Sequence, residues 1–288
     1  MQHSAPYFLG VDGGGSRCRV RIRDAGGQLL AEAEGGPSNI YQDFEGGVAM
    51  VIATAKKAAS EAGIAMESLH AGLGLAGVSS SVDGAKLLRE SLPFASVVAE
   101  NDGVAACMGA FQGGDGGILI MGTGSIGIAI VGGQRHMVGG WGFTLGDLGS
   151  GGWIGLQAAQ RAALVIDNMM LSSPFIEKVM AVAGDNRIDL TQWSVDAAPR
   201  DFASLAREAF AGAEAGDPHA KEIIVAGAGH ISDLGKTLLS RGAKQLCLMG
   251  GLALSYEPYL SEDIRAVAVK PKADALDGAI LLARRAPA

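Results

Sequence analysis

The segment FLGVDGGGSRCRVRI, residues 8–22, decides the fold of this chain. An apolar run ends in Asp12, three glycines and Ser16 follow, and polar and apolar residues then alternate. The pattern predicts two strands, Tyr7–Asp12 and Arg17–Arg23, joined by a tight turn. A hairpin alone requires neither an acid after a buried strand nor a third glycine. Because glycine N–H groups can line a nest for phosphate oxygens, the turn is either a plain hairpin or a phosphate seat.

Asp12 is the unusual residue of this turn. A carboxylate beside a phosphate nest repels the phosphate unless Mg²⁺ or its waters lie between the two. The segment by itself leaves both interpretations open, so the rest of the chain has to decide between them.

The pattern recurs in GILIMGTGSIGIAIV, residues 117–131. Its turn, Gly122-Thr123-Gly124-Ser125, lacks the acid and offers N–H groups and two hydroxyls, which suits direct phosphate binding. The letters also match a dinucleotide fingerprint, but that motif needs a following helix, and IAIV is typical of a strand. The repeat predicts two similarly folded halves.

Two further strand ends carry candidate site residues. Asp102 follows the expected strand Ser96–Glu100 and begins the expected helix Asp102–Phe111. It is either an N-cap or a general base that the helix N-terminus keeps ionised. Gly250-Gly251 follows an apolar strand and is either a routine turn or a place where a flat adenine lies against backbone.

The remaining pattern alternates strands with helices, which indicates mixed α/β layers. Other strands are expected at 28–34, 70–76, 134–140, 244–249 and 267–269, and other helices at 44–62, 83–91, 151–165, 174–182, 202–215, 218–240 and 274–284.

Composition excludes several classes of function. The formal net charge of −7 argues against a nucleic-acid or membrane-surface partner, since those need clustered Lys and Arg. No apolar run approaches the roughly 18 residues of a membrane span, and the N-terminus lacks a signal-peptide pattern. Cys18, Cys107 and Cys247 are scattered and form neither a disulfide framework nor a metal motif. We expect a cytoplasmic protein.

The order of these motifs resembles that of the sugar-kinase/Hsp70/actin superfamily. Within it, the chain resembles the N-acetylglucosamine kinase and BadF/BcrA-type ATPase family over nearly its whole length. Supporting segments are GGPSNIY 35–41, LGLAGVSS 73–80, VGGWGFTLGDLGSGGWIG 138–155 and VKPKADALDGAILLA 269–283.

The resemblance implies a fold of two ribonuclease-H-like, actin-like ATPase domains that flank a cleft for nucleotide and sugar. The first domain is expected over residues 1–112, with the helix 274–288 packing back on it. The second is expected over 113–273 with a helical insertion. The implied activity is ATP-dependent phosphorylation of the 6-hydroxyl of an amino sugar. D-glucosamine is the first candidate and N-acetylglucosamine the alternative; family members are often dimers, so a homodimer is one expectation.

The same resemblance assigns roles to individual residues. Asp12 would hold Mg²⁺ through water, and Asp102 would be the catalytic base and contact the sugar. Phosphate contacts are implied for Gly13, Gly14, Gly15, Ser16, Gly122, Thr123, Gly124 and Ser125, and adenosine contacts for Gly250 and Gly251. Sugar contacts are implied for Ser38, Asn39, Gly139, Gly140, Trp141 and Asp147.

One departure concerns the choice of sugar. Relatives that act on N-acetylglucosamine often read Gly-Asp-Glu-Gly-Ser in the sugar loop, whereas this chain has Leu148 in place of the Glu. A glucosamine ammonium would favour a nearby carboxylate, for which Asp147 and Asp43 are candidates. Two other classes stay open: an ATPase that activates a redox partner, and a sugar sensor without catalysis.

Overall fold

The computed structural model describes residues 6–78, 87 and 92–285. The strands are β1 (Tyr7–Gly13), β2 (Cys18–Arg23), β3 (Leu29–Gly35), β4 (Leu69–Leu75), β5 (Ser96–Asn101), β6 (Gly116–Met121), β7 (Ser125–Val131), β8 (Gln134–Gly139) and β9 (Leu246–Met249). The α-helices are α1 (Phe44–Ala62), α3 (Asp102–Ala110), α4 (Gly151–Ile166), α5 (Pro174–Ala183), α6 (Arg187–Asp196), α7 (Pro199–Ala203), α8 (Ala206–Glu214), α9 (Pro218–Ser240), α10 (Ala253–Tyr256), α11 (Glu262–Ala266) and α12 (Ala275–Arg285), with short 3₁₀ helices at Met66–Ser68 and Glu257–Tyr259.

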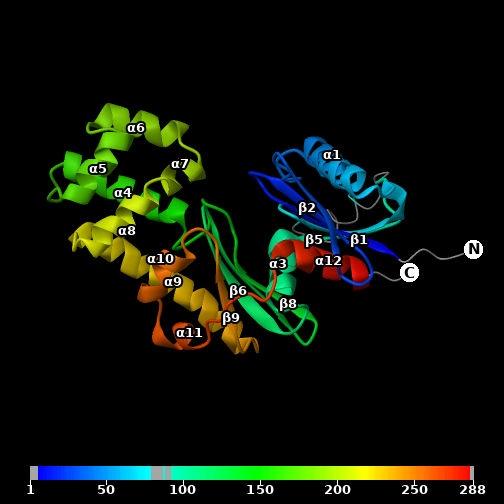
Figure 1. The fold of residues 1–288 in the computed structure, drawn as a ribbon. Helices are drawn as coiled ribbons and strands as arrows, with labels where there is room; N and C mark the ends of the chain where they lie inside the picture. The colour runs from blue at the N-terminus through cyan, green and yellow to red at the C-terminus, as the bar shows by residue number, and fades with distance from the viewer. Residues whose placement is uncertain (1–5, 79–86, 88–91, 286–288) are drawn as a thin grey trace, which may run out of the picture. The chain divides into compact units, whose positions relative to one another are not determined.

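The strands form two sheets, which confirms the prediction of an α/β protein with two similar halves (Figure 1). Two compact units result. Unit 1 comprises residues 1–116, 130–135 and 270–288, and unit 2 comprises 117–129 and 136–269. None of the described helices is long and apolar enough to cross a membrane.

The sheet of unit 1 has the order β3-β2-β1-β4-β5. β1 pairs antiparallel with β2 and parallel with β4, and β4 pairs parallel with β5. Apolar residues of β1 and β4, such as Leu9, Val11 and Leu73, are fully buried in one cluster with residues of α1. Figure 1 shows α1 on one side of this sheet and α3 with α12 on the other.

Glycines on the second face of this sheet allow α12 to lie directly on the backbone. A Cβ built on Gly10 would lie 2.3 Å from the Leu276 carbonyl oxygen, and one on Gly72 would lie 1.8 Å from that of Ala279. The alternation of β1 therefore places Leu9 and Val11 toward α1, and Gly10 and Asp12 toward the α3 and α12 face.

Arginines of β2 occupy the same face as Gly10 and Asp12. Arg21 forms ion pairs with Glu32 of β3 and with Asp274 and Asp277 at the start of α12. These acids raise the pKa of the Arg21 guanidinium against the opposing effect of burial, which is the larger single influence. Arg23 also pairs with Asp277, so the polar positions of β2 tie the sheet to α12.

In unit 2 the sheet has the order β8-β7-β6-β9, with β6 and β9 parallel. Helices α4 to α9 follow β8 in the chain and are drawn as a group in green and yellow in Figure 1. Buried apolar residues along α9, including Ile224, Ile231 and Leu238, confirm that this segment is an amphipathic helix.

Several expected elements were wrong in detail. The helix expected over 202–215 is two helices, α7 and α8, because the chain turns at Ser204 and Leu205. The strand expected at 267–269 is a single bridge between Leu246 and Ala268. The helix α6 was missed because its apolar residues do not form one face; only Leu190 in it is buried. The helix expected at 83–91 lies, apart from Leu87, outside the described residues.

Candidate functional site

In unit 1, Asp12 and Asp102 lie at the carboxyl ends of β1 and β5, the two strands on either side of β4. The register aligns Gly13 of β1 with Leu75 of β4, and Leu75 with Asn101 of β5. Asp12 and Asp102 therefore stand at the same edge of the sheet, the edge where parallel α/β sheets bind ligands. The Cα of Asp102 lies near Gly74, where a Cβ would be 3.6 Å from it.

Asp102 is not the cap of α3. The cap is Asn101, whose side chain accepts a hydrogen bond from the Gly103 N–H at 3.0 Å, and Asp102 Oδ1 accepts from the same N–H at 2.9 Å. Burial raises the pKa of the Asp102 carboxyl, and the charge of Asp12 raises it further; the Gly103 N–H opposes both. The Gly103 N–H at the start of α3 favours the ionised carboxylate, as expected of a helix N-terminus, although burial has the larger and opposite effect on the pKa. A raised pKa suits a general base, which works best near the operating pH.

Backbone hydrogen bonds and the buried Ser38 hold the glycine turn between β1 and β2 in place. The Gly14 N–H donates to the Arg17 carbonyl at 2.9 Å, and the Ser38 N–H donates to the Gly14 carbonyl at 2.9 Å. The fully buried Ser38 hydroxyl lies against Gly13, where a Cβ would approach it to 2.5 Å. Gly15 and Ser16 are exposed at the tip. Ser38 thus supports the turn from its buried side, and the tip of the turn is open to solvent.

The side chains of Asn39 and Asp43 both accept hydrogen bonds from nearby backbone N–H groups. Asn39 Oδ1 accepts from the Tyr41 N–H at 2.9 Å, which leaves its amide nitrogen as the group near Gly15. Asp43 is the N-cap of α1 and accepts from the Gly46 N–H at 2.9 Å. Asn39 can therefore donate to a ligand, whereas the Asp43 carboxylate is committed to capping.

In unit 2 the second glycine turn meets the first turn of α4. The Gly151 N–H donates to the Gly122 carbonyl at 2.8 Å, and the Gly152 N–H donates to that of Thr123 at 3.1 Å. The positive end of the α4 dipole is thus directed at this turn, an arrangement that favours anions. The Ser125 hydroxyl donates to the Leu148 carbonyl at 2.9 Å, so it fixes the sugar loop and is not turned outward.

Gly250 and Gly251 lie beside that turn but differ in character. A Cβ on Gly250, whose φ is 93°, would lie 2.3 Å from the Met121 carbonyl oxygen, so this glycine is required by the fold. A Cβ on Gly251 or on Gly122 would meet no protein atom within 4 Å. These two glycines are not explained by packing within the chain, as expected where a ligand lies against backbone.

Gly251→Ala and Gly122→Ala should keep the Tm of the parent protein and raise the KM for ATP about tenfold, a cost of about 1.4 kcal/mol in binding. The protein leaves room for either methyl group, whereas a nucleotide against the backbone does not. Thermal unfolding and ATP kinetics measure the two effects. Gly250→Ala is the comparison, since it should lower the Tm; an unchanged KM in Gly251→Ala would remove this glycine from the nucleotide site.

Asp147 adopts a left-handed conformation, with φ of 51°, in the loop before α4. Its Oδ1 lies 3.4 Å from the Ser125 N–H, and a Cβ on Gly124 would lie 2.8 Å from its Oδ2. Burial raises the pKa of this carboxyl, while the N–H groups of Ser125 and Gly142 lower it. Asp147 therefore joins the sugar loop to the second glycine turn.

A pocket of about 290 Å³ brings four predicted residues together, namely Ser125, Gly139, Trp141 and Asp147. Its other wall is α9, which adds His230 and Asp233. Sequence reasoning missed these two because the α9 pattern indicated only an amphipathic helix. Trp141 is 74% exposed, so it is a surface aromatic and not part of the core. That exposure favours the sugar-stacking interpretation of Trp141.

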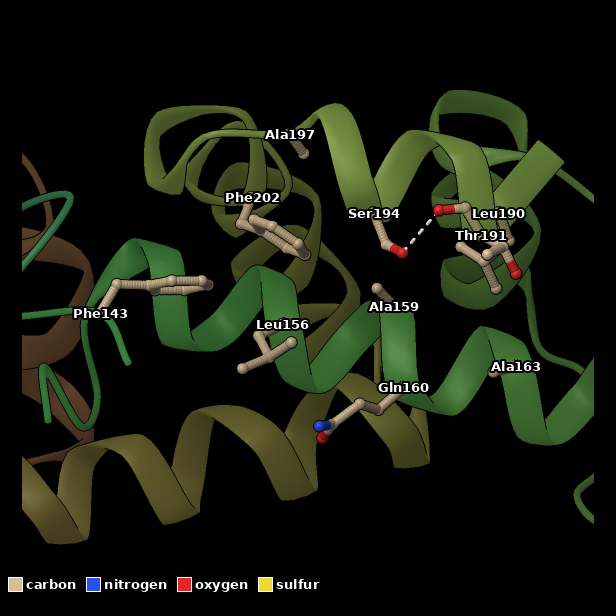
Figure 2. A pocket seen from close by; sticks show the side chains of 10 residues that line it. All are labelled: Phe143, Leu156, Ala159, Gln160, Ala163, Leu190, Thr191, Ser194, Ala197 and Phe202. Carbon is tan, nitrogen blue, oxygen red and sulfur yellow. Dashed lines mark hydrogen bonds between the residues drawn. The ribbon is translucent and has the colours of Figure 1, made fainter. Parts of the chain in front are cut away.

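A larger pocket, of about 460 Å³, contains none of the predicted residues. Figure 2 shows Leu156, Ala159 and Gln160 of α4 along one side, with Thr191 and Ser194 of α6 opposite. Phe143 and Phe202, with ring centroids 5.2 Å apart, close the end nearest the start of α4. The pocket belongs to the helical part of unit 2 and is lined mainly by apolar groups.

The carboxylates of unit 1 are too few to hold Mg²⁺ without further ligands. Mg²⁺ commonly uses one or two carboxylates and completes its shell with waters and substrate phosphates. Asp12 supplies one carboxylate beside the first glycine turn, whereas the described residues contain no group of three or more His, Cys, Asp or Glu that could hold a metal. The residues therefore fit a metal that arrives with a nucleotide.

All three cysteines are buried: Cys18 in β2, Cys107 in α3 and Cys247 in β9. Burial raises the pKa of the Cys18 and Cys247 thiols. They are core residues and do not form a surface set suited to an iron–sulfur cluster between subunits.

Comparison with known proteins agrees with this geometry. Residues 9–283 match the model of the BadF/BadG/BcrA/BcrD ATPase family, and the chain belongs to that family. It is 35% identical to the glucosamine kinase GspK of Vibrio cholerae over 280 residues, which are 96% of this chain and 95% of that protein. It is 28% identical to the N-acetyl-D-glucosamine kinase of Dictyostelium discoideum over 268 residues, covering 83% and 81% of the two chains.

A solved structure of similar fold comes from Chromobacterium violaceum, described as a candidate N-acetylglucosamine kinase. It has a TM-score of 0.89 and 31% identity, and the match covers 97% of this chain and 99% of the other. The expected two-domain ATPase fold is thereby confirmed.

Proposed function

We propose that this protein is an ATP-dependent kinase that transfers a phosphoryl group to the 6-hydroxyl of an amino sugar, with D-glucosamine as the first candidate. The observation that carries the proposal is the placement of Asp102. It is a partly buried carboxylate of raised pKa, it is not the cap of its helix, and it stands beside a glycine turn that carries a second acid.

In this mechanism Asp102 accepts the proton of the sugar hydroxyl, the sugar oxygen attacks the γ-phosphorus in line, and the bond to the ADP oxygen breaks. The N–H groups of the turns at Gly13–Ser16 and Gly122–Ser125 stabilise the charge on the phosphate oxygens. Mg²⁺ held beside Asp12 would supply further charge neutralisation on those oxygens. Little covalent chemistry is asked of the chain beyond holding one proton.

Two observations favour glucosamine over N-acetylglucosamine as the proposed substrate. The relative with the highest identity among those compared above is named a glucosamine kinase. The pocket beside the sugar loop also holds Asp147 and Asp233, and carboxylates favour an ammonium over an acetamide. Asp43, the other candidate, is less suitable because it caps α1.

A panel of sugars tests this choice. Purified protein with ATP and Mg²⁺ is offered glucosamine, N-acetylglucosamine, N-acetylmannosamine and glucose, and ADP release is followed for each. We expect the largest kcat/KM with glucosamine. A larger kcat/KM with N-acetylglucosamine would change the proposed substrate but not the proposed kinase activity. If no sugar stimulated ADP release, the kinase activity itself would be contradicted.

A further inference from the structure

Arg19 faces Asp12 directly across the first hairpin. The two residues are register partners in the β1–β2 pair, and their side chains lie on the same face of the sheet. Arg19 Nε lies 3.2 Å and Nη2 2.5 Å from Oδ2 of Asp12. The side chains are 31% and 23% exposed, so this is a partly buried, charge-assisted contact at the mouth of the glycine turn.

The other arginines of β2 have different tasks. Arg21 and Arg23 pair with acids of β3 and α12 and thereby hold secondary structure together. Arg17, which precedes β2, is 59% exposed, and its Nη1 lies 3.9 Å from Oε1 of Glu34. Arg19 alone among them has its hydrogen bonds on a carboxylate of the candidate site.

This pair conflicts with the role expected of Asp12. The guanidinium contacts Oδ2 and leaves Oδ1 to a metal ion or its water. Two cations on one carboxylate nevertheless repel each other. A metal at Asp12 would therefore weaken the hold of Arg19 on this carboxylate and favour its release. The Arg19 side chain lies at Asp12, the residue that leads into the glycine turn, and its planar fork is suited to bidentate binding of phosphate.

We propose that Arg19 is an exchangeable partner of Asp12: it neutralises the carboxylate until nucleotide binds, and then transfers to the phosphate oxygens while Asp12 turns to the metal. The inference rests on the proposed function, because it requires a nucleotide at this turn. It makes Arg19 a nucleotide-binding residue and gives the hairpin a reason to place opposite charges seven residues apart. The Arg19–Asp12 pair is exchanged for two others, Arg19 with phosphate and Asp12 with the metal. Metal and nucleotide should therefore bind more tightly together than separately.

The test uses binding and not turnover, in the full chain without sugar. Mn²⁺ binding without nucleotide is measured by the electron paramagnetic resonance of the free ion, and ATP binding with Mg²⁺ by calorimetry. Arg19→Ala should bind Mn²⁺ alone about tenfold more tightly, because the competing guanidinium is gone, and should bind MgATP about tenfold more weakly. Arg19→Lys, which keeps the charge but loses the fork, should fall between the two proteins in MgATP affinity.

Arg23→Ala is the matched control, since it removes an arginine of the same strand and face that also pairs with a carboxylate. It should leave both affinities unchanged, and equal Tm values of Arg19→Ala and the parent establish that the fold is kept. A purely structural Arg19 would weaken both affinities or neither, and either result overturns the exchange. If the parent protein itself binds no ATP, the proposed function fails, and not the exchange alone.

Discussion

Asp102→Asn is expected to lower the rate of sugar phosphorylation by about 10²–10⁴-fold, the usual contribution of a general base. ATP binding should be retained, because the glycine turns are untouched. The amide keeps an oxygen at the position where Oδ1 accepts from the Gly103 N–H, so α3 should not be disturbed. Steady-state kinetics and ATP calorimetry on the same preparation measure both effects.

Asn101→Ser is the control for this substitution. It changes the neighbouring residue but preserves an N-cap, since serine caps helices about as well as asparagine. Activity near that of the parent is expected. If Asp102→Asn kept substantial turnover, or if Asn101→Ser lost as much, Asp102 would be a structural residue and not the base.

The raised pKa of Asp102 has consequences for pH dependence. The base must be ionised, so the acid limb of kcat/KM should lie above the range of an ordinary aspartate. The free energy of unfolding depends on pH in the opposite direction from activity. The ionised form is disfavoured in the folded protein, so stability falls as pH rises from the unfolded to the folded pKa, and the cost is fully present above the folded pKa. Asp102→Asn should therefore raise the Tm at neutral pH and not in acid.

Gly72→Ala is expected to produce the largest loss of stability, about 3 kcal/mol or more. Its Cβ would lie 1.8 Å from the Ala279 carbonyl oxygen and 3.0 Å from the Ala283 nitrogen, so α12 would have to move off the sheet. A fall in Tm on the order of 10 °C is expected in thermal unfolding followed by circular dichroism. Activity should also fall, because α12 packs on both β1 and α3, which carry Asp12 and Asp102.

Gly229→Ala is the control for Gly72→Ala, because it places the same methyl group where there is room for it. Gly229 is exposed within α9, and a Cβ there would meet nothing within 4 Å. Alanine should stabilise the helix by about 0.5–1 kcal/mol. If both variants shifted the Tm in the same direction, the close contact between α12 and the sheet would not be the reason that Gly72 is a glycine.

The two sheets and the strand ends of the candidate site were predictable because they depend on short-range patterns. The period of two in residues 8–22 and its repeat at 117–131 predict both hairpins. The carboxylate after a buried strand singles out Asp12 in the same way. The helical part of unit 2 was harder, since α6 presents no apolar face and α7 and α8 are separated by a turn without glycine or proline.

Contacts between distant segments explain what the sequence could not predict. Asp274, the partner of Arg21 just before α12, is 253 residues away. His230 and Asp233 reach the pocket of Asp147 only because α9 packs beside the sugar loop. Arg19 opposite Asp12 could have been predicted, because a hairpin with a known turn fixes the register and period two fixes the face.

Phosphorylation of the 6-hydroxyl is tested by identifying the product of one complete reaction. The parent protein, ATP, Mg²⁺ and glucosamine are followed by phosphorus NMR, with the phosphorus correlated to the sugar protons. A kinase that acts on the 6-hydroxyl should form a sugar monophosphate whose phosphorus couples to the two protons on carbon 6, with one ADP formed for each. Formation of ADP and inorganic phosphate at a rate independent of sugar would contradict it and would indicate an ATPase instead.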